Sequence, residues 1–143
     1  MAQARANHTA SRLADGTVLF VGGDDRRAIL ASAEVYDPSA GSWSSAGDLT
    51  RGRFSHTATL LQDGRLLATG GRDHEFFLLR SAEVFVPATT RWSSSGEMET
   101  AREFHTATLL EDGSVMAGGG FINGRVTASA ELYDPSTGTW SSP

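Results

Sequence analysis

Three histidines recur along the chain and are the residues best suited to carry chemistry. His8, His56 and His105 lie 48 and 49 residues apart. Imidazole nitrogens are common metal ligands, so three of them converging on one axis could form a metal site. A residue that recurs once per repeat more often serves the hydrogen bonding of the repeat itself. We therefore expect a structural role for these histidines and no metal site.

Two kinds of charged residue recur with the same period as the histidines. An arginine stands three residues before each histidine, and a glutamate follows later in a Ser-Ala-Glu segment. Charged side chains that become buried need partners of opposite charge. We therefore expect structural arginine–glutamate pairs within or between the repeats. The residues are Arg5, Arg53 and Arg102, and Glu34, Glu83 and Glu131.

The rest of the composition excludes several kinds of catalysis. The chain has no cysteine, so it can form neither a disulfide, nor a zinc–thiolate site, nor a thiol nucleophile. It shows no Ser-His-Asp order, no phosphate loop and no paired acidic site with a recognisable spacing. Its three Asp-Gly pairs lack the further carboxylates of a calcium loop and are better interpreted as hairpin turns. We expect no enzyme activity and no cofactor.

Composition and charge narrow the fold class and the partners. Of the 143 residues, 39% are hydrophobic and 16 residues are glycine, which suits a globular, turn-rich, all-β protein. The net charge of −5 argues against nucleic acid, which favours basic surfaces. No segment approaches the roughly 20 apolar residues of a transmembrane helix, so we expect no membrane partner.

Residues 53–92 show which elements must position these side chains. This segment contains short runs rich in β-branched and apolar residues, joined by an Asp-Gly hairpin signal, a polar loop and a turn. Consecutive strands with short connections make a meander sheet. The expected strands are 56–61, 65–69, 81–85 and 91–94, with the hairpin at 63–64 and the turn at 87–90.

The same unit occurs three times. The histidines, the Asp-Gly pairs, the glycine pairs and Trp43, Trp92 and Trp140 keep one order and nearly one spacing. A four-stranded repeat of this length is typical of a β-propeller blade and not of a helical solenoid. We expect one repeat region, with blade 1 at 1–48, blade 2 at 49–97 and blade 3 at 98–143.

These recurring elements resemble the kelch repeat family. The matching features are the Gly-Gly pair after the second strand, the tryptophan of the fourth, and Tyr36-Asp37-Pro38 and Tyr133-Asp134-Pro135 in the third. The middle copy has Phe85-Val86-Pro87, which lacks the carboxylate. The resemblance implies antiparallel propeller blades, most often in rings of six or seven, used chiefly for binding. Within that family, galactose oxidase uses copper and a tyrosine–cysteine cross-link, which this chain cannot form.

Three blades cannot close a ring alone, because propellers have roughly four to eight blades. The outer faces of blades 1 and 3 would expose apolar surface that is meant for a neighbour. Either two copies associate as a homodimer, each chain forming half of a six-bladed ring, or the sequence is a piece of a longer propeller. Arg12 stands where the other blades have Leu60 and Leu109, which indicates that this face of blade 1 is covered differently.

The loops after the glycine pairs differ between the copies, so we expect the binding site there. In a meander these loops and the blade-to-blade connections share one face, where Arg51, Arg53, Glu103 and Phe104 would lie nearby. Arginines, carboxylates and exposed aromatic residues on a rigid scaffold suit a protein or glycan ligand, with His74 and the Phe76-Phe77 pair as the strongest candidates. The candidates are Asp24, Arg26 and Arg27; Arg72, Asp73, His74, Phe76 and Phe77; and Phe121, Asn123 and Arg125.

Two classes of function remain open. The first is a non-catalytic binding or scaffold module that presents loops at one propeller face to a protein or carbohydrate. The second is a fragment of a larger kelch propeller enzyme or of a carbohydrate-active protein. Binding is favoured, because no catalytic constellation is recognisable in the chain.

Overall fold

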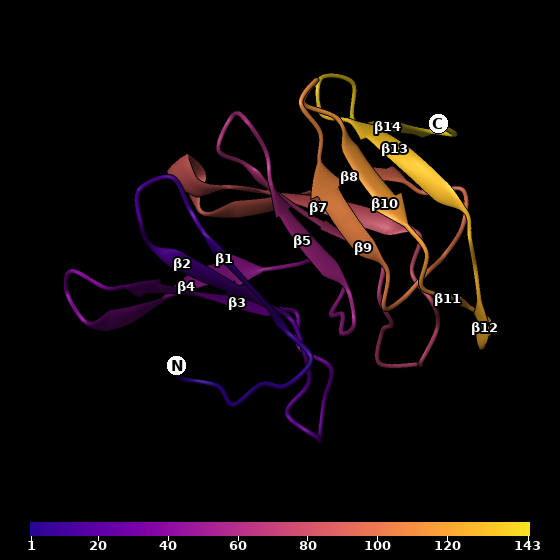
Figure 1. Ribbon diagram of the computed structural model, residues 1–143. Coiled ribbons are helices and arrows are strands. Elements are labelled where there is room, and N and C mark those ends of the chain that lie inside the picture. Colours follow the sequence, from indigo (N-terminus) through magenta and orange to yellow (C-terminus); the bar gives the residue numbers. More distant parts are fainter.

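The computed structural model describes residues 1–143 as an all-β chain of three four-stranded sheets that stand side by side in chain order (Figure 1). Each sheet is an antiparallel meander, as expected for kelch blades. The first sheet has the order β1-β2-β3-β4. Its strands are β1 (Thr9–Arg12), β2 (Val18–Val21), β3 (Ser32–Asp37) and β4 (Ser42–Asp48).

The second sheet follows the strand prediction closely. Its order is β5-β6-β7-β8, and the expected turn after β7 is the short 3-10 helix η1 (Pro87–Thr89). The strands are β5 (Thr57–Leu60), β6 (Leu66–Thr69), β7 (Ser81–Val86) and β8 (Arg91–Glu97).

No helical segment of the structure has the length and hydropathy needed to span a lipid bilayer.

The third sheet contains an addition that the sequence analysis did not predict. A separate two-stranded hairpin, β11 (Phe121–Ile122) and β12 (Arg125–Val126), stands in the loop between the second and third strands of the sheet. Asn123-Gly124 forms its turn with positive φ angles of 50° and 76°, and this dipeptide is a strong hairpin signal. The four sheet strands are β9 (Thr106–Leu109), β10 (Val115–Gly118), β13 (Ala130–Asp134) and β14 (Thr139–Ser141).

The Asp-Gly pairs form the hairpin turns that were predicted between the first two strands of each sheet. In the first turn, the Asp15 carboxylate accepts hydrogen bonds from the Thr17 backbone N–H at 2.9 Å and from its hydroxyl at 2.7 Å. These bonds hold the pKa of Asp15 below its usual value. The aspartates therefore shape their own turns.

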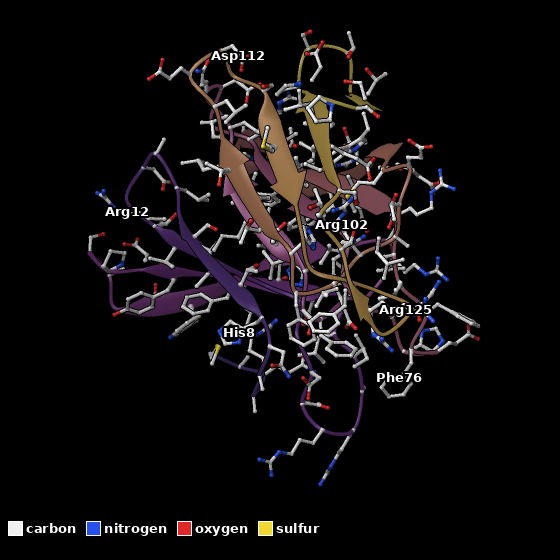
Figure 2. All side chains as sticks on the ribbon, turned by 45° about the vertical axis from the view of Figure 1, so that its right-hand side comes forward. His8, Arg12, Phe76, Arg102, Asp112 and Arg125 are labelled. Atoms are coloured by element: carbon white, nitrogen blue, oxygen red, sulfur yellow. The ribbon has the colours of Figure 1, made fainter.

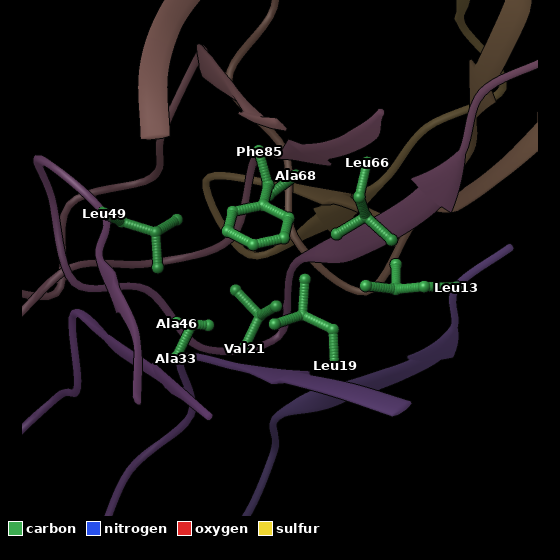
Figure 3. Packing of buried hydrophobic residues seen from close by; sticks show 9 residues of the cluster. All are labelled: Leu13, Leu19, Val21, Ala33, Ala46, Leu49, Leu66, Ala68 and Phe85. Atoms are coloured by element: carbon green, nitrogen blue, oxygen red, sulfur yellow. The ribbon is translucent and has the colours of Figure 1, made fainter. Parts of the chain in front are cut away.

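The sheets pack face against face, and the alternation of strand side chains supplies both faces. We call the face toward the preceding sheet the leading face and the opposite face the trailing face. Leu19 and Val21 on the trailing face of β2 pack against Leu66 and Phe85 on the leading face of the second sheet (Figure 3). The next junction repeats this pattern through the cluster that contains Leu61, Leu67, Ala82, Val84, Val115 and Tyr133.

The three sheets do not close into a ring. The innermost strands lie in the sequence β1, β5, β9, and the outer strands β4, β8 and β14 follow the same order. No sheet covers the leading face of the first sheet or the trailing face of the third. Trp43 on the former face is 37% exposed, whereas the equivalent Trp92 and Trp140 are partly buried against a neighbouring sheet.

Candidate functional site

Each recurring arginine is buried and holds a blade together from inside. The Arg53 side chain is fully buried and donates to Glu83 Oε1 at 2.8 Å and to the backbone carbonyls of Gly70 and Ser81, each at 3.0 Å. Glu83 also accepts the backbone N–H of Thr50 at 2.7 Å. The pair therefore ties the blade-to-blade connection to β7.

The other two blades repeat this arrangement. Arg5 pairs with Glu34 at 2.8 Å and Arg102 pairs with Glu131 at 2.9 Å, and all three arginine side chains have no exposed surface. The expected structural pairing is confirmed, and each pair lies within one blade. Arg53, which the sequence analysis placed near the loop face, is fully buried, and its guanidinium bonds only to groups within the blade.

The recurring histidines join neighbouring blades. His56 Nε2 lies 3.1 Å from Thr9 Oγ1 of the first sheet, and His105 Nε2 lies 3.1 Å from Thr57 Oγ1 and Thr69 Oγ1 of the second. Burial, with a smaller effect from the Arg102 charge, lowers the pKa of His105 to about 4. The structure contains no cluster of three or more His, Cys, Asp or Glu side chains that could hold a metal.

The loops after the glycine pairs gather at one end of the sheets. Antiparallel bridges join each loop to the segment that leads into its own blade, at Ala6–Asp24, Phe54–Arg72 and Glu103–Phe121. Figure 2 shows Phe76 and Arg125 together at this end, whereas Asp112 lies at the opposite, hairpin-turn end. We call the loop end the mouth.

In the first loop, two arginines extend into solvent. The Asp24 carboxylate is used within the loop, because it accepts hydrogen bonds from Asn7 Nδ2 at 2.8 Å and from the backbone N–H of Arg26 at 3.2 Å. Asp25 accepts the backbone N–H groups of Arg27 and Ala28. Arg26 and Arg27 are exposed and form no ion pair within the chain.

In the second loop, Asp73 is fully buried and organises the backbone. Its Oδ1 accepts the N–H groups of Glu75 and Phe77, each at 3.0 Å, and its Oδ2 lies 2.9 Å from Arg51. Arg72 likewise faces a protein partner, since its Nε lies 2.7 Å from Glu103 Oε2 on the next blade. Neither charge is free for a ligand.

The aromatic residues of the same loop are directed outward. Phe76 and Phe77 are 65% and 62% exposed, and His74 is exposed beside them. Phe76 adopts a positive φ of 61°, which a bulky side chain rarely does, and its ring meets Phe54 edge to face at 6.3 Å. Strained backbone held in place at a surface loop is frequent at binding sites.

The third loop is the β11–β12 hairpin. Phe121 is 38% exposed and contacts Phe104 edge to face at 6.1 Å. Asn123 stands in the hairpin turn, and Arg125 is exposed on β12. These residues flank the mouth without entering the cavity described next.

A cavity of about 370 Å³ opens at the mouth between the first and second blades. It brings together five of the predicted binding residues from two loops. The sequence analysis did not predict that Phe54 forms part of its wall. A signal was available, because this position differs between the copies, with Ala6, Phe54 and Glu103. The lining residues are Asn7, Asp24, Arg26, Arg27, Ala28, Ile29, Phe54, His74 and Phe76.

A larger cavity, of about 570 Å³, lies at the hairpin-turn end between the second and third blades. Its wall includes Asp63, Asp112 and Asp134, whose carboxylates accept hydrogen bonds from their own turns. Arg65 in this wall is paired with Asp63 at 2.7 Å. The smaller mouth cavity is the better candidate for a binding site, because its arginines, unlike Arg65, form no ion pair within the chain.

Comparison with known families agrees with the repeat pattern. The family model described as the Kelch motif matches residues 5–50 and 112–143, which together make up more than half of the chain. No curated protein matches the chain. The two matched segments include most of the first blade and the later part of the third.

Proposed function

The chain belongs to the kelch repeat family, and on that premise we propose that it is a non-catalytic binding module whose mouth cavity holds a segment of a partner protein. Kelch repeats are generally protein-binding scaffolds and are typically non-catalytic. Rigid sheets that carry variable loops suit this role, because the scaffold fixes the position of loops that can differ freely.

The mouth cavity is the observation that carries the proposal. It offers an apolar wall of Phe54, Phe76 and Ile29 beside the guanidinium groups of Arg26 and Arg27. Aromatic residues and arginines dominate the binding energy of protein interfaces, particularly where an apolar anchor enters a pocket. A peptide with one apolar side chain and nearby carbonyl or carboxylate acceptors fits this surface.

A carbohydrate ligand is the second candidate. The amide of Asn7 and the guanidinium groups of Arg26 and Arg27 can donate hydrogen bonds to hydroxyl oxygens beside the Phe76 ring. The binding function is shared by both candidates, and only the chemistry of the ligand differs. A role as part of a larger kelch enzyme has less support, because His56, His105 and the buried acidic residues Glu83, Asp73 and Glu103 already have partners within the chain.

We further propose that self-association completes the propeller. The uncovered leading face of the first sheet and the uncovered trailing face of the third are of the kind that neighbouring blades cover. Two copies would supply six blades in a ring with two-fold symmetry. The mouth cavity lies between the first two blades of one chain, so ligand binding does not require the second copy.

Selection from a phage-displayed random peptide library, with a glycan array in parallel, tests the binding proposal. The affinity of the best ligand is then measured by calorimetry for the wild type, Phe76→Ala and Phe77→Ala. We expect Phe76→Ala to weaken binding roughly tenfold or more, because it removes an aromatic wall of the cavity.

Phe77→Ala is the matched control, since Phe77 is almost equally exposed in the same loop but does not line the cavity. It should change affinity by less than about threefold. Unchanged affinity in Phe76→Ala, or equal losses in both variants, would refute the assignment of the site. A glycan hit without any peptide hit would replace the protein ligand with the carbohydrate one.

A further inference from the structure

The leading face of the first sheet is built like the covered leading faces of the other two. Phe20 and Tyr36 each pack against Trp43 in a tilted arrangement with ring centroids 5.0 Å apart. The equivalent pairs, Phe85–Trp92 at 5.1 Å and Tyr133–Trp140 at 5.2 Å, lie against the preceding sheet. The first sheet therefore presents a junction face that lacks its neighbour.

The trailing face of the third sheet is incomplete in the corresponding way. Leu110, Met116 and Leu132 occupy the positions at which the second sheet has Leu61, Leu67 and Val84. The residues of the second sheet are buried in the core of the next junction, whereas their counterparts in the third sheet are partly exposed. This face therefore offers the apolar neighbour that is missing at the leading face of the first sheet.

The backbone leaves matching groups free at both faces. Phe104 N–H donates to Ser55 C=O at 3.0 Å, and Ser55 N–H donates to Asn7 C=O at 3.2 Å. These three residues are equivalent, and all have positive φ angles between 51° and 54°. The series would close if Asn7 N–H donated to Phe104 C=O of another copy, since neither group has a partner within the chain.

The same relation holds for the histidine that joins each blade to the one before. His56 contacts Thr9 and His105 contacts Thr57, each at 3.1 Å. His8 has no preceding blade to contact, and Thr106, the threonine equivalent to Thr9 and Thr57, is exposed. A junction between the third blade of one copy and the first blade of another would pair them.

One charged pair distinguishes this missing junction from the two that are present. At the junction between blades 1 and 2, the hairpin turn of blade 1 has Ala14 and the first strand of blade 2 has Leu60. At the junction between blades 2 and 3, the equivalent residues are Gln62 and Leu109. At the missing junction the corresponding residues are Glu111 and Arg12. A carboxylate and a guanidinium thus occur together at the one junction that needs a second copy, which is charge complementarity between the two free faces.

The positions of these two side chains support a direct contact. Gln62 extends across the junction between blades 2 and 3. Its Oε1 lies 3.0 Å from the position that a Cβ atom would occupy on Gly113. Its Nε2 donates a hydrogen bond to the backbone carbonyl of Glu111 at 3.3 Å. Glu111 is the counterpart of Gln62, and Gly16 is the counterpart of Gly113. Arg12 Nη2 lies 3.7 Å from the position that a Cβ atom would occupy on Gly16. A Glu111 side chain that extends across the missing junction as Gln62 does would therefore end beside the Arg12 guanidinium.

We propose that a second copy of this chain covers both free faces, and that an Arg12–Glu111 ion pair across each of the two junctions selects it. The proposal rests on the ring closure proposed above and names its partner and its specificity contacts. Arg12 and Glu111 do not line the mouth cavity, so the pair acts in assembly and not in ligand binding. Figure 2 shows Arg12 at the edge of the first sheet, far from Phe76.

Charge reversal with complementation between two variants tests this proposal. Arg12→Glu places two carboxylates at each junction, and Glu111→Arg places two guanidinium groups there. Each variant alone should dimerise at least roughly tenfold more weakly than the wild type, as measured by sedimentation velocity over a dilution series. An equimolar mixture should recover the dimer, because both junctions of the mixed species pair Glu with Arg.

Arg91→Glu is the control, since Arg91 is exposed on β8 away from both junction faces, and it should leave the dimer unchanged. Recovery in the mixture cannot come from a folding defect, because each variant would keep its own defect. Variants that dimerise like the wild type, or a mixture that does not recover, would overturn the proposal. Peptide binding measured on the same variants should stay intact, which separates failure of this proposal from failure of the mouth site.

Discussion

At the scale of single residues, the polar groups that recur once per blade are structural. Arg53 and Glu83 form a buried pair, and His56 and His105 connect one blade to the next. Their periodic spacing in the sequence already favoured this role over a metal site. The residues that differ between copies, such as Phe76 and Arg27, remain exposed at the mouth, as the proposed binding role requires.

The buried histidines predict an acid-sensitive fold. The pKa of His105 is lowered to about 4 and that of His56 also lies well below 6.5, chiefly because of burial. Between about pH 6.5 and 4 the unfolded chain therefore binds protons that the folded chain does not. His105 alone should make the free energy of unfolding roughly 2 to 3 kcal/mol lower at pH 4.5 than at pH 7.5, and His56 should add to this loss, as measured by urea denaturation at fixed protein concentration.

His105→Asn should make this dependence shallower, because the amide can still bond to Thr57 but does not titrate, while His56 keeps its own contribution. His74→Asn is the control, since the His74 side chain is 72% exposed in a loop, and it should keep the wild-type profile. Hydrogen bonds within their turns lower the pKa values of Asp15 and Asp112, so these carboxylates affect stability only at the acid end of this window, and equally in the wild type and both variants. A pH profile that is the same in wild type and His105→Asn would contradict the assignment.

At the scale of elements, the sequence specifies the strands well and the loops poorly. Alternating side chains and Asp-Gly turns predicted the second sheet, whose strands differ from the expected ranges by a few terminal residues. The β11–β12 hairpin was missed although Asn123-Gly124 signals it. The burial of Asp73 could not be predicted, because it depends on the turn that brings the N–H groups of Glu75 and Phe77 onto its carboxylate.

The connection between blades depends on the buried glutamate, which predicts a large effect of a small change. Glu83→Gln keeps the volume of the side chain but removes the charge that neutralises Arg53. A buried charge left without its partner costs about 3 kcal/mol of stability or more. We expect that loss in the free energy of unfolding, measured by urea denaturation followed by tryptophan fluorescence.

Glu97→Gln is the matched control for this change. Glu97 is 62% exposed and lies 3.9 Å from Arg80, so its loss should cost less than about 0.5 kcal/mol. If Glu83→Gln were as stable as the control, the buried pair would not be what fastens the connection to the blade.

At the scale of the whole molecule, three blades form two complete junctions and leave the two faces of a third. The apolar faces, the free backbone groups of Asn7 and Phe104, and the charges of Arg12 and Glu111 all match in one arrangement of two copies. Such a ring would present two identical mouth cavities on one face, which favours ligands with repeated binding segments. Blade spacing could be derived from the sequence alone, whereas the proposed pairing of Arg12 with Glu111 required knowing which turn faces which strand.

The solution mass of the wild-type chain tests this account most directly. Light scattering on a sizing column across a dilution series should give a dimer of about twice the 15.2 kDa chain mass. A dimer that stops at this mass means that both pairs of free faces are satisfied at once. A folded monomer at all concentrations, or head-to-tail polymers of increasing length, would contradict the closed ring of six blades.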